Sequence, residues 1–293
     1  MLTRSFIFLR GVGEREERHF WAQGIYSWDA LLDALPELPV HPRRKSVWIR
    51  QIAAAEHALR EMDISWLARN FPATERWRLI PDLWSVTAFV DVEAYQIRPG
   101  QYRMTIAGVL FRNAYHSFLA GRNLSALSRL LADARLMVSF GGQGFDLQMI
   151  RQTFPHWQLP FLHIDLQPLY RRAGLPEGLK KLERMFGWKR GAGLDGLGGW
   201  IAVQLWEWHQ EGDDRALQAL IRYNFEDVIH LPELAVFIYN ELAEQLRCPF
   251  PRFHPPLPRL RPPDVDRSII AELHRRRSRY VRSGTKTRQE GHR

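Results

Sequence analysis

The feature that most constrains this chain is a short apolar run that ends on two acids, Ser85 to Ala94 (SVTAFVDVEA). Its β-branched and aromatic residues, without polar alternation, predict a strand that is buried on both faces. Side chains alternate along a strand, so Asp91 and Glu93 leave the same face about 7 Å apart. Two neighbouring carboxylates repel each other and lose hydration in a core, so the pair indicates either a cation or a solvated strand end.

The positive charge of the chain is concentrated at its C-terminal end. The 293 residues carry a net charge of +9, and residues 251–293 hold twelve Lys or Arg against four acids, which is +8. This leaves +1 for the first 250 residues. We therefore expect a nearly neutral folded body, which suits a site that binds cations, and a basic tail that can bind a polyanion.

Several classes of protein are disfavoured by the sequence. The single cysteine, Cys248, excludes an internal disulfide and a cysteine-cluster metal site. The first apolar run, residues 6–9, is too short for a signal sequence, and no window approaches a membrane span. A GxGxxG pattern at residues 191–196 follows a helix instead of a strand, which argues against a dinucleotide site. We expect a cytoplasmic protein with no membrane contact and no nucleotide cofactor.

Residues 1–45 predict a small helical cap. Two short helices flank the turn Gly11-Val12-Gly13, and Ser27 is a typical N-cap for the second helix. The turn resembles a helix-hairpin-helix unit, which binds backbone phosphate without reading sequence. Three glutamates follow the turn and would repel phosphate from the amides there, so a structural cap and a DNA clamp both stay open.

Beyond a helical connector over residues 46–84, the pattern predicts an α/β domain over residues 85–245. The expected strands cover 85–93, 101–111, 114–119 and 136–140, with helices over 124–133, 200–210 and 215–242. A strand meander followed by a helix and a strand differs from a Rossmann unit and favours a mixed sheet of ribonuclease-H type flanked by helices. Residues 246–293, rich in Pro and Arg, predict a flexible basic tail.

Two later segments also carry acids. The strand that ends at Phe140 leads into Gly-Gly-Gln-Gly-Phe-Asp, residues 141–146, where glycines allow close approach to a strand or a ligand. Asp146 begins the next helix, either as an N-cap or as part of a site. On the last long helix Tyr223 and Asp227 share a face, because they are four residues apart.

The chain carries three motifs in a fixed order: Asp-x-Glu on a strand, Phe-Asp where a strand becomes a helix, and Tyr-x-x-x-Asp on a late helix. Their order resembles that of the motifs of a known nuclease family. The family is that of the DnaQ-like (DEDD) 3′–5′ exonucleases in the tyrosine variant, and especially the YprB-type ribonuclease-H-like domain of bacteria. The resemblance covers residues 86–242 and, more loosely, residues 9–35. The chain departs from the family pattern at Gly141, where the family has Asn, and at Ala94, where a Thr usually follows.

The resemblance implies a metal-dependent 3′–5′ exonuclease that hydrolyses single-stranded DNA or RNA ends with two Mg²⁺ or Mn²⁺ ions. It implies that Asp91 bridges both ions and that Glu93 and Asp227 complete the site of the ion that activates water. Asp146 would bind the second ion mainly through its waters. Tyr223 would orient the attacking water, because a phenol with a pKa near 10 is a poor base at neutral pH.

His163 and Asp165, on a further strand expected over residues 161–166, are secondary candidates for the site. Candidates for nucleic-acid contacts are Gly142, Gln143, Phe145, Arg275, Arg276 and Arg277. The alternative function is a catalytically weakened nuclease fold that acts as a nucleic-acid-binding protein, which the Gly141 departure and the basic tail motivate. Endonucleolytic cleavage by the same site also stays open, and the sequence leaves the identity of any protein partner unknown.

Overall fold

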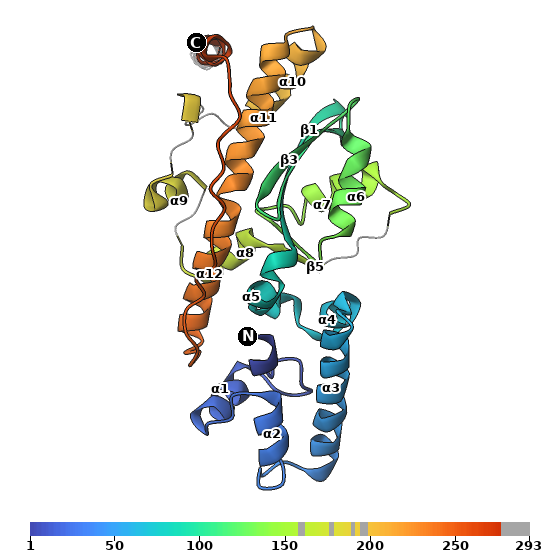
Figure 1. The fold of residues 1–293 in the computed structure, drawn as a ribbon, viewed down its shortest axis with the longest axis vertical. Helices are drawn as coiled ribbons and strands as arrows, with labels where there is room; N and C mark the ends of the chain where they lie inside the picture. The colour runs from blue at the N-terminus through green and yellow to red at the C-terminus, as the bar shows by residue number, and fades with distance from the viewer. Residues whose placement is uncertain (158–161, 176–178, 189–190, 194–198, 277–293) are drawn as a thin grey trace, which may run out of the picture.

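The computed structural model describes residues 1–157, 162–175, 179–188, 191–193 and 199–276, which form an elongated molecule (Figure 1). The N-terminal helices lie at one end, a five-stranded sheet occupies the middle, and α10 (Trp200–Gln210) lies at the other end. Within these ranges, every helix is too short or too polar to cross a lipid bilayer.

The sheet is mixed, as the sequence predicts. Its strand order is β3-β2-β1-β4-β5, with β1, β2 and β3 antiparallel and β4 and β5 parallel to β1. The strands are β1 (Thr87–Arg98), β2 (Gln101–Phe111), β3 (Ala114–Leu119), β4 (Leu136–Ser139) and β5 (Leu162–Asp165). The strand with the two acids therefore lies at the centre of the sheet, where it pairs with β2 along most of its length and with β4 over residues 87–89.

Helices cover both faces of the sheet, so β1 is buried on both faces over residues 87–90, whereas the hairpin end of β1 and β2, residues 96–103, is exposed. Val90 and Val92 of β1 pack on one face with residues of α6 (Leu127–Ala132) and α7 (Asp146–Thr153). Phe89 lies in the core of the opposite face. The helices in the cores of this opposite face include α8 (Leu166–Arg172), α10, α11 (Asp214–Ile229) and α12 (Leu231–Gln245).

The last long helix of the domain is two helices, not one. The sequence pattern predicted a single helix over residues 215–242, but α11 ends at Ile229 and α12 begins at Leu231. Pro232 lies in the first turn of α12, where its missing N–H costs nothing, whereas inside a continuous helix its ring would clash with the preceding turn. The break leaves α11 free to cross β1 and β2.

The N-terminal region contains two short helices, but both follow the Gly11–Gly13 turn instead of flanking it as expected. Ser27 accepts a hydrogen bond from the backbone N–H of Ala30 and caps the second helix, as predicted. The long helix of the connector starts at Pro42, earlier than expected, because His41 caps it and proline suits its first turn. The helices of the cap and the connector are α1 (Glu14–Ala22), α2 (Trp28–Ala34), α3 (Pro42–Arg60), α4 (Ile64–Asn70) and α5 (Ile80–Leu83). The remaining helix, α9 (Leu179–Phe186), belongs to the α/β domain.

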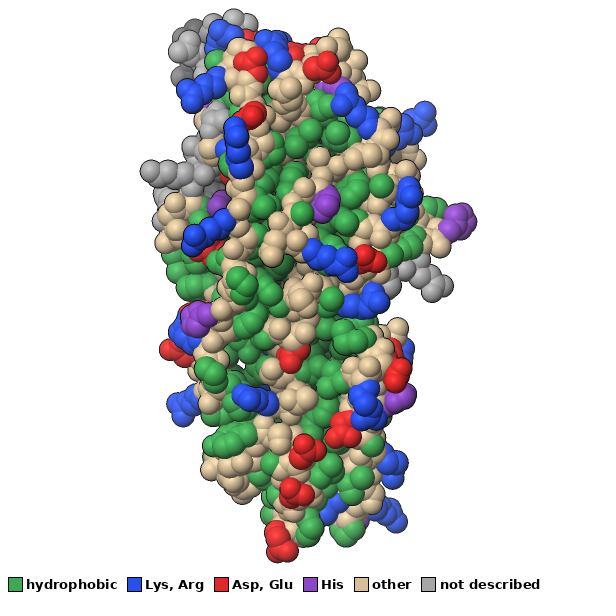
Figure 2. All heavy atoms as spheres, viewed as in Figure 1, with side chains coloured by type: hydrophobic (Ala, Val, Ile, Leu, Met, Phe, Trp, Pro, Cys, Tyr) green, Lys and Arg blue, Asp and Glu red, His purple; other side chains and the backbone are tan. Residues whose placement is uncertain are grey.

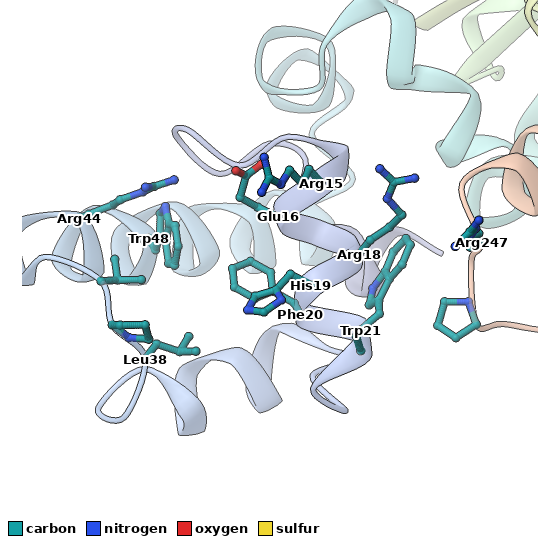
Figure 3. A pocket seen from close by; sticks show the side chains of 14 residues that line it. Arg15, Glu16, Arg18, His19, Phe20, Trp21, Leu38, Arg44, Trp48 and Arg247 are labelled. Carbon is teal, nitrogen blue, oxygen red and sulfur yellow. The ribbon is translucent and has the colours of Figure 1, made fainter.

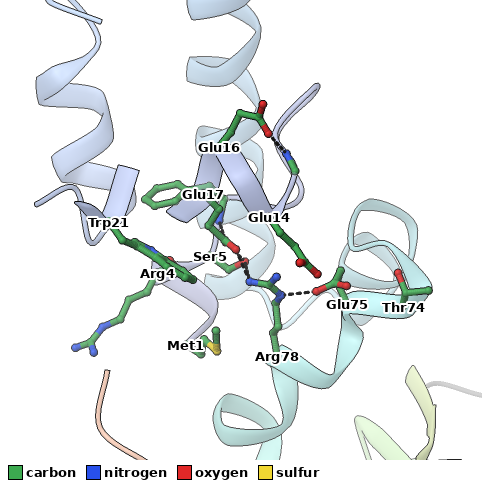
Figure 4. Close-up of polar contacts among 12 residues, drawn as sticks. Met1, Arg4, Ser5, Glu14, Glu16, Glu17, Trp21, Thr74, Glu75 and Arg78 are labelled. Carbon is green, nitrogen blue, oxygen red and sulfur yellow. Dashed lines mark hydrogen bonds and ion pairs between the residues drawn. The ribbon is translucent and has the colours of Figure 1, made fainter. Parts of the chain in front are cut away.

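A buried arginine joins the cap to the connector (Figure 4). Arg78 has no exposed side-chain surface, and its guanidinium forms ion pairs with Glu17 of α1 and with Glu75. Glu17 also accepts hydrogen bonds from the hydroxyl of Ser5 and the backbone N–H of Phe6. These contacts fix the first turn of α1 against the rest of the chain.

The other two glutamates of that turn also contact protein groups. Glu16 accepts from the backbone N–H of Gly13, and Glu14 pairs with Arg172 of α8. The turn itself lies against α3, since Arg44 donates to the carbonyl of Gly11. This arrangement favours the structural cap over a DNA clamp.

Part of the segment expected as a flexible tail is packed on the body. Phe253 contacts the rings of Trp84 and Tyr239, with ring centroids 5.4 and 5.6 Å apart. Residues 267–276 form a helix whose apolar side chains, Ile269, Ile270 and Leu273, are buried in the core formed with α10 and α11. Arg277 and residues 194–196 of the GxGxxG pattern lie outside the described residues.

We predict that Arg78→Met lowers the free energy of unfolding by about 3–5 kcal/mol, because it leaves the buried Glu17 carboxylate without its cation, while Glu75 keeps only its ion pair with Arg172. Urea unfolding followed by circular dichroism measures the change. Arg112→Met is the matched control, because the Arg112–Asp133 pair is mostly exposed and its loss costs less than about 1 kcal/mol. Equal losses in the two variants would contradict the structural role of Arg78.

Candidate functional site

Three carboxylates from two elements meet at one point. One oxygen atom from each of Asp91, Glu93 and Asp227 lies within 4.8 Å of the others. The first two leave β1 on the face that α11 covers, and Asp227 comes from α11 itself. The resemblance to the exonuclease motifs implied that these three acids share one site.

The donor set fits a divalent cation. All three side chains are only partly exposed, so water screens their mutual repulsion incompletely, and a bound cation would relieve it. Carboxylate oxygens are the ligands that Mg²⁺ and Mn²⁺ prefer. Asp91, Glu93 and Asp227 are therefore the residues that would hold such an ion.

Asp146 lies beside this group and is not part of it. It is the first residue of α7 and is 5% exposed. Burial raises the pKa of its carboxyl to about 7, and the nearby Asp165 carboxylate adds to the effect, whereas the backbone amide of Val92 lowers the pKa. Because Val92 separates Asp91 from Glu93 along β1, this contact brings Asp146 to the strand between the two ligands.

The glycine turn between β4 and α7 makes room for Asp146. A Cβ atom on Gly142 would lie 2.2 Å from the Ser139 hydroxyl and 2.4 Å from an Asp146 carboxylate oxygen, so a side chain does not fit there. Gly141 has φ = +77°, a left-handed conformation that glycine adopts freely and asparagine tolerates. The backbone requirement at position 141 is therefore met by either residue, Gly here or Asn in the family pattern.

Asp165 holds the glycine turn in place. Its carboxylate accepts hydrogen bonds from the backbone N–H groups of Gly141 at 2.7 Å, Gln143 at 3.0 Å and Gln167 at 2.9 Å. It lies at the end of β5, next to the end of β4. The structure thus places this secondary candidate at the turn and outside the group of three carboxylates.

His163 is also placed next to the turn. Its Nε2 atom lies 2.8 Å from the Ser139 hydroxyl oxygen. Burial lowers the pKa of His163 to about 4, with Arg151 and Arg76 adding to the effect and Asp165 opposing it. The imidazole is therefore neutral at pH 7, which agrees with a buried strand histidine that contacts a neighbour.

The remaining predicted residues lie in three places. Tyr223 is one turn before Asp227 on α11 and is buried in the core between α10 and α11. Gln143 is exposed on the glycine turn, and the ring of Phe145 meets Tyr102 edge-on, with centroids 5.9 Å apart. Arg275 and Arg276 both pair with Glu272 on the C-terminal helical segment.

One buried polar residue was missed by the sequence reasoning. Asn224, next to Tyr223, has no exposed surface, and its side-chain NH₂ donates to an Asp91 carboxylate oxygen at 2.8 Å. The available signal was the position of Asn224 between two aromatic residues, Tyr223 and Phe225, inside the Tyr-x-x-x-Asp motif.

A large cavity elsewhere in the molecule does not contain such a group of acids. It has a volume of about 1120 Å³ and lies on the N-terminal helices, where Arg15, Arg18 and Arg44 line it together with Arg247 (Figure 3). Its one acid, Glu16, caps the glycine turn. Figure 2 shows Lys and Arg side chains spread over one face of the molecule with acids among them, so this face carries no single basic band.

We predict that Asp146→Asn raises the melting temperature of the metal-free protein at pH 8, and raises it by a clearly smaller amount at pH 5. An acid whose pKa is raised in the folded state stabilises the fold at low pH, and this contribution is lost progressively as the pH rises from its ordinary pKa of 3.8 to its folded pKa of about 7. Asparagine avoids the buried charge and keeps an acceptor for Val92. Calorimetry should show a rise of at least about 2 °C at pH 8, the shift that 1 kcal/mol gives in a large domain.

The control for this measurement is Asp133→Asn, at an exposed position. It should leave the melting temperature nearly unchanged at both pH values. An equal effect of Asp146→Asn at pH 5 and pH 8 would contradict the assigned pKa.

Comparisons with known proteins agree with the fold. Residues 88–239 match the model of the RNase H superfamily family RNase_H_2. No curated protein matches the chain. The family match confirms the predicted ribonuclease-H-like family, whereas the YprB subtype remains a prediction.

Solved structures are similar at low identity. Mg²⁺-bound NrnC of Brucella melitensis is 15% identical, with a TM-score of 0.38 over 58% of this chain and 80% of that one. The Nibbler EXO domain of Aedes aegypti is 13% identical, with a TM-score of 0.40 over 59% of this chain and 86% of that one.

The family B DNA polymerase of Pyrobaculum calidifontis is 16% identical, with a TM-score of 0.39 over 55% of this chain. The match spans only 24% of the polymerase. The family match covers more than half of the present chain, from the first sheet strand to α12, and includes every residue of the three-carboxylate group. The chain therefore belongs to the RNase H superfamily.

Proposed function

We propose that the protein is a metal-dependent 3′–5′ exonuclease that hydrolyses phosphodiester bonds at single-stranded nucleic acid ends. The observation that carries the proposal is the approach of Asp91, Glu93 and Asp227 within 4.8 Å in a chain of the RNase H superfamily. Such a group has little structural use, because like charges held together destabilise a fold unless a cation joins them.

Some residues of the chain would bind the cations, and another would orient the attacking water. Divalent cations, when bound, supply positive charge to the phosphate and lower the pKa of water. Asp91, Glu93 and Asp227 would hold them, and Asp146, buried beside β1, would face the same region from α7. Tyr223 would orient the attacking water, as the resemblance implies, from one turn before Asp227.

Aromatic side chains near the glycine turn support a single-stranded substrate. Phe145 is partly exposed and meets Tyr102, which is 43% exposed. Unpaired bases stack on exposed aromatic rings with little dependence on sequence, whereas bases in a duplex are already stacked. The polarity of cleavage, 3′ to 5′, rests on the order of the three motifs.

We predict that the purified protein with Mg²⁺ or Mn²⁺ shortens a 5′-labelled oligonucleotide from its 3′ end. Asp91→Asn should reduce the rate by more than about 100-fold, the upper range for loss of a group that only supports a metal ligand. Denaturing gels resolve the ladder of products, and DNA and RNA oligonucleotides of one sequence are compared. Asp133→Asn, at an exposed position outside the three motifs, should retain the rate.

Two further substrates separate the alternatives. Internal cuts in a circular single strand would indicate an endonuclease. Binding without cleavage, weakened by salt, unaffected by Asp91→Asn and abolished by removal of residues 277–293, would contradict the proposal and indicate a nucleic-acid-binding protein. This truncation leaves the packed helix over residues 267–276 in place.

A further inference from the structure

The side chain of Asn224 connects α11 to the central strand. Its Nδ2 atom donates to the Asp91 carboxylate oxygen Oδ2 at 2.8 Å and lies 3.3 Å from the Asp91 backbone carbonyl oxygen. An ionised carboxylate only accepts hydrogen bonds, so the amide must present its NH₂ group to Asp91 and its oxygen to the other side. Asn224 is fully buried, which makes this orientation costly to change.

Tyr115 of β3 holds the oxygen side of the same amide. Its hydroxyl donates to Asn224 Oδ1 at 2.8 Å, and its ring meets Phe225 edge-on, with centroids 5.1 Å apart. Burial raises the pKa of Tyr115 far above its ordinary value, and the charges of Asp91 and Asp227 add to this. The phenol therefore stays protonated and remains a donor at any working pH.

Gly108 of β2 makes the space that Asn224 occupies. It is paired directly opposite Asp91 in the sheet. A Cβ atom at this position would lie 1.7 Å from Asn224 Oδ1 and 3.1 Å from a ring carbon of Tyr115. Glycine weakens the interior of a strand, and here it allows a helix side chain to reach the strand beside it.

We propose that Asn224 is a positioning residue that orients the Asp91 carboxylate for divalent-cation binding, and that Tyr115 and Gly108 hold Asn224 in place. The inference rests on the proposed function of the three-carboxylate group. A hydrogen bond to one carboxylate oxygen restricts rotation of the group, and such supporting partners tune the affinity of a metal ligand. Residues from β1, β2, β3 and α11 thus converge on one ligand.

The test measures Mn²⁺ binding without substrate, by isothermal titration calorimetry. Asn224→Leu keeps the approximate size of the side chain and removes its donor and acceptor. We expect the Kd for Mn²⁺ to rise by about 10- to 100-fold. Activity is measured in parallel, and the loss should shrink when Mn²⁺ is raised towards saturation.

Asn240→Leu is the matched control. Asn240 is also a buried asparagine of a late helix, 4% exposed, and makes two hydrogen bonds, but both are to the backbone of Phe253. Its substitution should lower stability in a similar way and leave the Kd for Mn²⁺ unchanged. The control separates a role at Asp91 from the general cost of removing a buried amide.

Two more variants keep the test decisive if Asn224→Leu does not fold. Tyr115→Phe removes one hydroxyl and should raise the Kd for Mn²⁺ by roughly 2- to 10-fold, the equivalent of one neutral hydrogen bond. Gly108→Ala should displace Asn224 and weaken Mn²⁺ binding, although residue 108 itself offers no ligand atom.

Each outcome has a defined meaning. Native Mn²⁺ affinity in folded Asn224→Leu or, failing that, in both Tyr115→Phe and Gly108→Ala would overturn the positioning role while leaving the proposed function intact. Absence of Mn²⁺ binding by the unchanged protein would overturn both. Weakened Mn²⁺ binding in the variants of a protein that cleaves no oligonucleotide would support the positioning role and contradict the nuclease proposal.

Discussion

The candidate metal site depends on buried elements that hold three carboxylates close together against their electrostatic repulsion. Asp91 and Glu93 are fixed by the central strand of the sheet, and Asp227 is fixed by a helix that packs across two strands. Asn224 adds a direct hydrogen bond between this helix and Asp91. Because each ligand is set by a buried element, the group is arranged before any cation binds, which lowers the cost of ordering the ligands on binding.

Hydrogen bonds and ion pairs between segments that are distant in sequence fix the elements around the three carboxylates. Asp165 collects three backbone N–H groups and so fixes the glycine turn, while Gly142 leaves room for the Asp146 carboxylate. At the other side of the domain, the ion pairs of Arg78 fasten the N-terminal cap to the connector. The cap thus contributes to the stability of the fold, and its first-turn glutamates are engaged in protein contacts.

Much of the domain could be predicted because its signals are local. The strand with Asp91 follows from a short run of β-branched and aromatic residues without polar alternation, and the meander follows from its turns. The helix break at Pro232 was missed, because the apolar period continues through it and only the proline marks the boundary. The roles of Asn224 and Gly108 could not be predicted from either residue alone, because Asn224 fits only where residue 108, 116 positions away, has no side chain. The ion pair between Arg78 and Glu17 could not be predicted from the sequence either, because the two residues are 61 positions apart.

The most direct test of the central claim is a crystal structure of the protein soaked with Mn²⁺, with the ions located by their anomalous scattering. The account predicts at least one manganese peak in direct contact with carboxylate oxygens of Asp91, Glu93 and Asp227, and its loss in Asp91→Asn. Manganese bound only elsewhere on the molecule, with these three carboxylates carrying no ion, would contradict it.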